Sequence, residues 1–229
     1  MLTLPRLTLL DLDGTLVDTA SDLHHSVNAM LLQLGRPACA EADVRRWVGN
    51  GIERLVHRAL TGIMEGQAEL GLFEQAKHCF EHFYADANGR YSQIYPGVIE
   101  GLEYLQQHGS ILVCITNKRA LFSKPLLHAL GLATHFQLVL SGDSLARQKP
   151  DPLPLLHAAK TFDIEPQNCL MIGDSVNDVA AARAAGFAVV GVSYGYNHGQ
   201  PIALATPDVI VDSLAQLPLC FNNVITDCR

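Results

Sequence analysis

Two aspartates separated by one residue, Asp11 and Asp13, stand at the end of the first apolar segment of the chain, Leu7–Leu12. An apolar run of about six residues, stopped by a turn sequence such as Gly14-Thr15, is typical of a buried parallel strand. Side chains alternate along a strand, so both carboxylates would lie on the same side. Two desolvated carboxylates at this spacing repel each other strongly, and a divalent cation between them would relieve the repulsion. Taken alone, the pair also fits an ordinary strand exit with solvated acids.

Three more groups of polar residues follow strand-like segments: Thr116 with Asn117, Lys149 alone, and Asp174 with Asp178. Each has an ordinary reading, as a turn, a solvated lysine and a helix capping box. Their repeated position after successive strands favours one shared site, because the carboxyl ends of parallel strands meet at one edge of a sheet. Acids, a lysine, a hydroxyl and backbone donors at such an edge would suit a phosphate group and a hard cation.

The elements that position these groups alternate between strands and helices from Pro96 onward. Strands separated by helices of about ten residues indicate βαβ units with right-handed crossovers. The sequence therefore predicts an α/β fold with a doubly wound, Rossmann-like parallel sheet. The predicted strands are Leu7–Leu12, Ile111–Thr116, Phe136–Leu140, Cys169–Ile172, Ala188–Val192 and a short edge strand, Val209–Val211.

The segment between Asp18 and Arg90 contains no convincing strand. Its apolar residues recur at intervals of three and four, which is the spacing of amphipathic helices. We therefore expect an α-helical cap inserted directly after the first strand. The predicted parts are a core of residues 1–16 and 92–229, a cap of residues 17–91, and hinges near Leu16–Asp18 and Arg90–Pro96.

The composition argues against several classes of partner. The formal charge is −7 and no run of basic residues occurs, so nucleic acids and anionic membranes are poor candidates. The most apolar segment, Val179–Val192, is too short to span a bilayer, and the amino terminus carries the first strand in place of a signal peptide. Six cysteines form no Cys-x-x-Cys pair, and Cys114 and Cys169 fall within strand-like runs. A reduced, cytoplasmic, monomeric protein is the resulting prediction.

These motifs also carry a family resemblance. Asp11-Leu12-Asp13-Gly14-Thr15, Thr116-Asn117, Lys149-Pro150 and Gly173-Asp174 with Asp178 together resemble the four motifs of the haloacid dehalogenase superfamily, in its phosphatase branch. The predicted helical insertion is similar to the cap of that superfamily. Three further stretches, Trp47–Gly51, Tyr194–Gly199 and Pro207–Ile210, resemble bacterial phosphoglycolate phosphatases.

The resemblance implies a mechanism for the acids. Asp11 would be the nucleophile that forms an aspartyl-phosphate, and Asp13 the general acid and base. Mg²⁺ would be held by Asp11, by Asp174 and by the main-chain carbonyl of Asp13. The reaction implied is Mg²⁺-dependent hydrolysis of a small phosphate monoester.

The remaining motif residues would stabilise charge on the transferring phosphoryl group. The resemblance gives this role to Lys149, Thr116 and the backbone N–H groups near Asn117. Asp178 would support them, either by orienting Lys149 or by binding a metal-bound water.

The cap sequence bears on the choice of substrate. Gly49-Asn50-Gly51 directly precedes a predicted helix, whose free N–H groups would bind an anion. A second anion site above a phosphate site suits a small phosphorylated carboxylate, and 2-phosphoglycolate fits that description. The candidate substrate contacts in the cap are Gly49, Asn50, Gly51 and Arg45, with Arg46 and Arg54 as alternatives.

Two rival functions stay open from the sequence. A phosphatase or phosphomutase of the same fold could act on a sugar phosphate, because a mutase differs only in the hydroxyl that accepts the phosphoryl group. A receiver-type signalling domain also has a phosphorylatable aspartate, a threonine and a lysine at strand ends. The cap and Asp13 count against this switch, since a general acid and base beside the phosphorylated aspartate would promote its hydrolysis.

Overall fold

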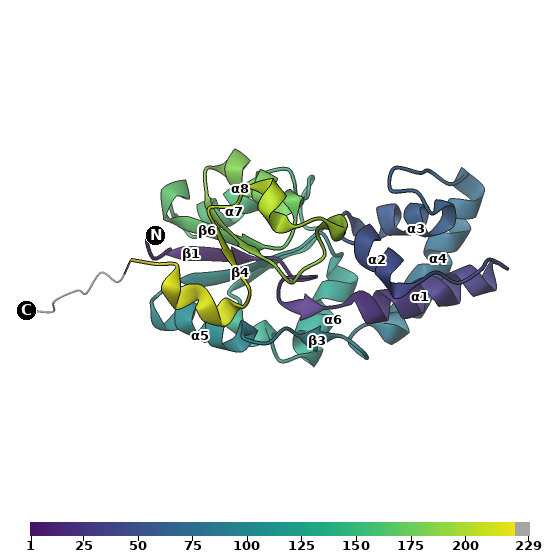
Figure 1. Cartoon of the computed structure of the whole chain (residues 1–229), viewed down its shortest axis with the longest axis horizontal. Helices are drawn as coiled ribbons and strands as arrows, with labels where there is room; N and C mark the ends of the chain where they lie inside the picture. Colours follow the sequence, from purple (N-terminus) through teal and green to yellow (C-terminus); the bar gives the residue numbers. More distant parts are fainter. Residues whose placement is uncertain (223–229) are drawn as a thin grey trace, which may run out of the picture.

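The structure is a computed structural model that describes residues 1–222 of the chain. Figure 1 shows two lobes, an α/β core and a smaller lobe made only of helices. The core contains a six-stranded sheet in the order β5-β4-β1-β6-β7-β8, in which every neighbouring pair is parallel. Its strands are β1 (Leu7–Leu10), β4 (Ile111–Ile115), β5 (Leu138–Leu140), β6 (Cys169–Gly173), β7 (Ala188–Val192) and β8 (Val209–Val211).

Helices cover the sheet and make up the second lobe. The core helices are α5 (Val98–Gln107), α6 (Ala120–Ala129), α7 (Leu153–Thr161) and α8 (Val176–Ala185). The second lobe contains α1 (Ala20–Gln33), α2 (Glu41–Trp47), α3 (Gly51–Thr61) and α4 (Leu70–Ala87). The predicted fold class is thus confirmed: a doubly wound parallel sheet with an inserted α-helical cap.

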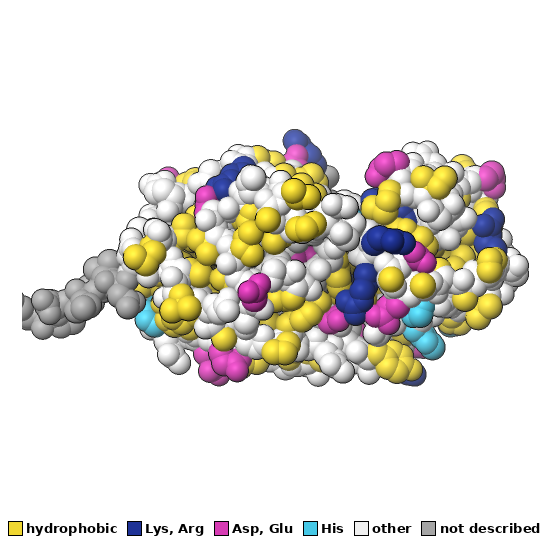
Figure 2. All heavy atoms as spheres, in the orientation of Figure 1, with side chains coloured by type: hydrophobic (Ala, Val, Ile, Leu, Met, Phe, Trp, Pro, Cys, Tyr) yellow, Lys and Arg dark blue, Asp and Glu magenta, His cyan; other side chains and the backbone are white. Residues whose placement is uncertain are grey.

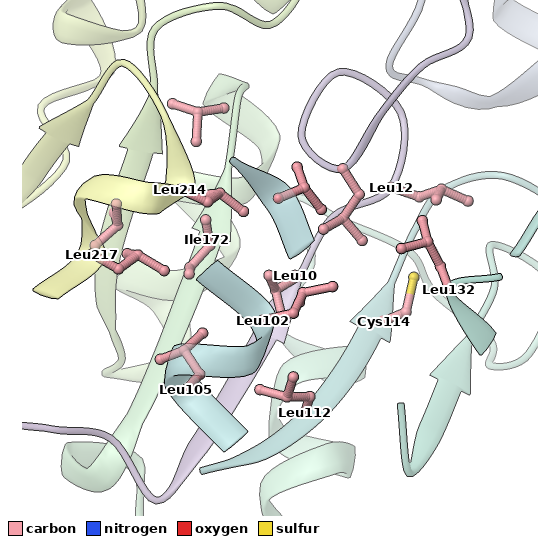
Figure 3. Packing of buried hydrophobic residues seen from close by; sticks show 14 of the residues in the cluster. Leu10, Leu12, Leu102, Leu105, Leu112, Cys114, Leu132, Ile172, Leu214 and Leu217 are labelled. Atoms are coloured by element: carbon pink, nitrogen blue, oxygen red, sulfur yellow. The ribbon is translucent and has the colours of Figure 1, made fainter. Parts of the chain in front are cut away.

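The central strands are buried on both faces, which explains their continuous apolar sequences. One face packs against α5 and a 3₁₀ segment at Leu214–Leu219. Figure 3 shows Leu102 of α5 beside Leu10 of the sheet. The other face packs against α7 and α8. A sheet covered in this way leaves its strand ends as the accessible edges.

The cap has a hydrophobic cluster of its own. Residues from all four cap helices contribute to it, among them Val27, Trp47, Val56 and Phe80. Phe122 of α6 and Tyr196 of the core join the same cluster, so the cap also packs against the core. Figure 2 shows a hollow between the two lobes on the face drawn there.

The two chain crossings between core and cap are paired with each other. Val17–Asp18 (β2) and Gln93–Ile94 (β3) form a two-stranded antiparallel ribbon. The sequence predicts hinges here and no strand, because two-residue strands lack a detectable alternating pattern. The exact cap boundaries at residues 17 and 91 stay a prediction.

Other differences from the prediction are local. The first strand ends at Leu10 and not at Leu12, since the backbone turns at Asp11 to bring Asp13 into an isolated bridge with Val17. The predicted strand Phe136–Leu140 is shortened at its start to Leu138. Among residues 1–222, no helix is both long enough and apolar enough to cross a membrane. The tail, which the sequence does not place, mostly lies outside the described residues.

Candidate active site

The order of strands reverses at β1. The chain passes from β1 to β4 and β5 on one side, and then to β6, β7 and β8 on the other. Open α/β sheets bind ligands at the carboxyl ends of the strands beside such a reversal. Asp11, Thr116 and Asp174 directly follow β1, β4 and β6 at this edge. The predicted convergence of these groups is therefore present.

A cavity of about 50 Å³ opens between this edge and the cap. The core side of its wall is polar and the cap side is mainly apolar. The core contributes Asp11, Asp13, Thr116, Asn117, Lys118, Asp174, Ser175, Tyr196 and Asn197, and the cap contributes Leu23, Val48, Gly49, Gly51, Ile52, Leu55 and Tyr84.

Lys149 connects two of the predicted acids. Its ammonium lies 2.9 Å from Asp11 Oδ1 and 2.6 Å from Asp178 Oδ1, and it donates to the Ile115 carbonyl. Burial opposes the charge on Lys149, but the two carboxylates outweigh it and raise its pKa. Burial raises the pKa of Asp11 well above its ordinary value, and Asp178 and Asp174 add to the shift while Lys149 opposes it. The Leu12 N–H also donates to Oδ1 of Asp11, so both interactions found for this carboxylate among the described residues are made by Oδ1, and Oδ2 is left for a ligand.

Asp178 uses both of its oxygens within the protein. Oδ1 accepts from Lys149, while Oδ2 accepts from the Ser175 N–H and hydroxyl at the start of α8. This arrangement combines the two roles weighed for Asp178, capping of α8 and orientation of Lys149. Binding of a metal-bound water by Asp178 stays a prediction.

Within residues 1–222, the side-chain hydrogen bonds of Asp13 are made through one oxygen. The Thr19 hydroxyl and the Lys118 ammonium both donate to Asp13 Oδ1, at 2.6 and 2.8 Å. Oδ2 of Asp13 is therefore the oxygen available to exchange a proton with a ligand. Thr19 is the N-cap residue of α1, yet its side chain makes no capping bond and binds Asp13 instead.

Asp174 is fixed by neighbours from two loops. Thr15 Oγ1 donates to its Oδ1 at 3.1 Å, and the Tyr196 N–H donates to its Oδ2 at 2.7 Å. A Cβ on Gly14 or on Gly195 would overlap the Asp174 side chain, so both positions require glycine. Burial, with a further contribution from Asp178, raises the pKa of Asp174 to about 7.

The acids fit a hard divalent cation. Oxygens of Asp11, Asp174 and Asp178 lie within 4.8 Å of one another. All are carboxylate oxygens, the donor type that Mg²⁺ and Ca²⁺ prefer. Burial raises the pKa values of Asp11 and Asp174, and a cation bound to both would offset the cost of burying the two charges. Asp11 and Asp174 line the cavity, whereas Asp178 does not, so Asp11 and Asp174 are the side chains suited to hold the ion.

A family model described as haloacid dehalogenase-like hydrolase matches residues 5–186 of the chain. The chain belongs to this hydrolase family. It is 50% identical over 217 residues to a phosphoglycolate phosphatase of Nitrosococcus oceani, covering 95% of this chain and 96% of the relative. It is 46% identical over 210 residues to a phosphoglycolate phosphatase of Thiobacillus denitrificans, covering 92% of each. A solved structure described as a predicted phosphoglycolate phosphatase from Haemophilus somnus has a TM-score of 0.90 and 38% identity, covering 96% of this chain and 99% of that one.

The cap loop of this hydrolase meets the core through backbone atoms. The Gly49 carbonyl accepts from the side-chain amides of Asn117 and Asn177, at 3.0 and 3.2 Å. Asn117 also donates to the Lys149 carbonyl, so its amide positions both the cap loop and the lysine backbone. Gly49 and Gly51 line the cavity, whereas Asn50 is not among the lining residues.

The candidate arginines of the cap have other partners. Arg45 lies 2.8 Å from Asp18 and 2.9 Å from Glu41 and does not line the cavity. Arg46 pairs with Asp43, and Arg54 pairs with Glu65. The sequence prediction treats these arginines as free cations, but acids of the cap and Asp18 of β2 pair with them.

Sequence reasoning missed two residues of the site in this hydrolase. Lys118 follows Thr116-Asn117 directly and reaches Asp13, but nothing in its local pattern distinguishes it from a surface lysine. Tyr196 is recognised only as part of a family-like stretch. Its hydroxyl accepts from the Thr19 and Ala20 N–H groups and donates to Asp18. It thereby fixes the start of α1 above the site.

Proposed function

We propose that this protein hydrolyses a small phosphate monoester, 2-phosphoglycolate, to glycolate and inorganic phosphate. The observation that carries the proposal is the pair of carboxylates at the floor of the cavity. Asp11 and Asp13 both line it, and each is bonded through Oδ1 so that its other oxygen is left for chemistry. One carboxylate can attack phosphorus while the other transfers a proton.

In the proposed first step, Asp11 Oδ2 attacks phosphorus in line with the leaving oxygen. The P–O bond to glycolate breaks, and Asp13 Oδ2 gives its proton to the leaving alkoxide. Lys149, which contacts Asp11, and Thr116 in the cavity wall neutralise charge on the phosphoryl oxygens. The product of this step is an aspartyl-phosphate on Asp11.

In the second step, Asp13 takes a proton from a water molecule that attacks the same phosphorus. Phosphate then leaves and Asp11 is regenerated. A Mg²⁺ ion held by Asp11, Asp174 and the main-chain carbonyl of Asp13 would supply the positive charge that phosphoryl transfer requires. Asp178 contributes indirectly, because its bond to Lys149 fixes the position of the ammonium.

Two observations support 2-phosphoglycolate over a sugar phosphate. The curated relatives at 50% and 46% identity are phosphoglycolate phosphatases. The cap wall of the cavity is formed largely by Leu23, Val48, Ile52 and Leu55, which offer no hydrogen bonds to sugar hydroxyls. A small substrate with a single methylene group between its phosphate ester oxygen and its carboxylate suits such a wall.

The test is a comparison of kcat/KM for 2-phosphoglycolate with those for glucose 1-phosphate, N-acetylmuramate 6-phosphate, pyrophosphate and phosphoglycerate. We expect 2-phosphoglycolate to be the best substrate. If any other compound exceeds it by tenfold, about 1.4 kcal/mol of transition-state discrimination, the substrate assignment fails and the phosphatase assignment survives. Steady release of phosphate separates the hydrolase from a mutase and from a phosphorylated switch.

A further inference from the structure

A lysine and a tyrosine form a polar pair in the cavity beside Asp13. Lys118 comes from the loop after β4, and its ammonium lies 5.0 Å from the ring centroid of Tyr84 on α4 of the cap. Both residues line the cavity and both are buried. The pair therefore spans the junction of core and cap.

Lys118 retains hydrogen-bonding capacity for a ligand. An ammonium has three N–H donors, and within residues 1–222 the hydrogen bond found for this one is to Asp13 Oδ1, at 2.8 Å. Among the cavity-lining residues of that same range, Lys118 is the one basic side chain. The arginines of the cap that were candidates for this purpose are paired elsewhere, as described above.

Tyr84 gives a second indication of a ligand. Its side chain is fully buried, and its hydroxyl makes no hydrogen bond of normal geometry within the described chain, although Lys118 lies close enough to oppose the rise in its pKa that burial causes. Buried polar groups in proteins are nearly always paired, so an unpaired hydroxyl on a cavity wall points to a partner from outside the protein. The ring is held in place by Phe80 and Phe122, with centroids 5.4 and 4.8 Å away.

The connectivity of the site indicates which ligand group this is. In the proposed function Asp13 contacts the oxygen that bridges phosphorus and carbon, and Lys118 contacts Asp13. A carboxylate attached to the carbon that bears this oxygen is only two bonds away from it. A cation beside Asp13 is therefore within reach of that carboxylate.

We propose that Lys118 and Tyr84 form the subsite that binds the substrate carboxylate and selects esters whose carboxylate lies on the phosphate-bearing carbon. This inference rests on the proposed phosphatase function and assigns its specificity to two residues. Lys118 supplies the charge and the Tyr84 hydroxyl supplies a neutral donor. Because Tyr84 belongs to the cap, the complete subsite exists only when the cap lies against the core.

The experiment compares 2-phosphoglycolate with its neutral amide, 2-phosphoglycolamide, which has the same shape and leaving oxygen. The readout is kcat/KM for 2-phosphoglycolate divided by kcat/KM for the amide. A loss of Asp13 function would lower both values alike and would leave this ratio unchanged. The wild-type protein should prefer the carboxylate. Lys118→Met should lower the ratio on the order of 10- to 100-fold, the range for a hydrogen bond to a charged group, and Tyr84→Phe should lower it about threefold to tenfold. Lys124→Met, at an exposed lysine of α6, is the matched control and should leave the ratio unchanged.

The outcomes are separable. If both substrates lose activity equally in Lys118→Met, Lys118 acts only through Asp13 and the proposal is wrong. If that variant does not fold, Tyr84→Phe decides, because it keeps the ring packing: a lowered ratio supports the subsite and an unchanged one overturns it. A wild-type protein without preference for the carboxylate also overturns it. Failure of the wild-type protein to release phosphate from either compound would instead refute the proposed function.

Discussion

Replacement of Asp13 by asparagine tests the proposed proton transfer with little change in shape. Thr19 and Lys118 both donate to Asp13 Oδ1, so the carbonyl oxygen of an asparagine can accept the same two bonds. The amide nitrogen then takes the place of Oδ2. It can neither give a proton to the leaving alkoxide nor accept one from water. The variant should therefore fold normally and lose both proton-transfer steps.

The expected loss follows from the usual contribution of general acid–base catalysis. That contribution is about 10²- to 10⁴-fold in rate, or about 3 to 5 kcal/mol in activation free energy. Turnover of 2-phosphoglycolate should fall by at least about 10²-fold. The Michaelis constant should change less, because Asp13 contributes little to ground-state binding.

A rapid-quench assay with acetyl phosphate isolates the proton given to the leaving group. Acetate leaves as a carboxylate and needs no proton, so phosphorylation of Asp11 should stay fast in Asp13→Asn. The second step still needs a base, and we expect a burst of about one acetate per active site followed by slow turnover. With 2-phosphoglycolate the variant should show no burst. Asp86→Asn, at an exposed carboxylate of α4, serves as the control.

Two results would refute this reasoning. Near-wild-type turnover of 2-phosphoglycolate by Asp13→Asn would show that another group transfers the proton. Equal slowing of the first step with both compounds would show that Asp13 acts on phosphorylation in some way unrelated to the leaving group.

Four further predictions concern Asp11, the metal ion, Gly195 and His198. Asp11→Asn should fold, with an unchanged circular dichroism spectrum, and release no measurable phosphate, because an amide does not attack phosphorus. Chelation should abolish activity and Mg²⁺ should restore it. At about a hundredfold excess over its dissociation constant, Mg²⁺ should raise the free energy of unfolding by about 2.7 kcal/mol. Calorimetry should detect this stabilisation in the wild type and not in Asp174→Asn. Gly195→Ala should displace Asp174 and lower kcat/KM by about 10²-fold, since its Cβ would overlap that side chain. Burial lowers the pKa of His198, which binds the Arg46 carbonyl, below its ordinary 6.5. The unfolded chain then binds the proton on this histidine first as pH falls, so His198 lowers the free energy of unfolding on acidification through 6.5. Asp174, whose pKa is raised to about 7, acts in the opposite direction, so the test is the difference between the wild type and His198→Gln in urea: this difference should shrink as pH falls through 6.5.

The sheet and the strand-end acids were predictable because their signals are local. Five consecutive apolar residues end at Thr116, and a similar run ends at Asp174, so each polar group could be assigned to a strand end from its immediate neighbours. The common edge then followed from the parallel order of the strands. The same reasoning placed Asp11 at a strand end, although the strand ends at Leu10, two residues before the end that the apolar pattern predicts.

Arg45–Glu41 and Arg46–Asp43 have the i,i+4 and i,i+3 spacing of helical ion pairs and could have been predicted, but the other cap contacts join residues that are distant in sequence. Arg45 looks like a free cation until the fold brings it to Asp18. Asp22 of α1 is fully buried and accepts from the Gly89 and Tyr91 N–H groups, which lie on the returning segment. The spacing of apolar residues predicts which face of a helix is buried. It does not predict which distant residue will pair with a given acid or base in the folded chain.

The paired crossings at β2 and β3 have a consequence for how such a chain could have been assembled. Val17 and Ile94 are partners in register, so the insertion leaves the core and returns to it at nearly one point. The core therefore requires that β2 and β3 pair with each other, and this pairing does not depend on the length of the inserted chain. Since the entropy of closing a loop grows slowly with its length, lobes of very different size can be exchanged here at a similar thermodynamic cost. The junction makes the catalytic sheet a reusable platform, on which new specificity can be acquired by replacing one continuous segment of the gene.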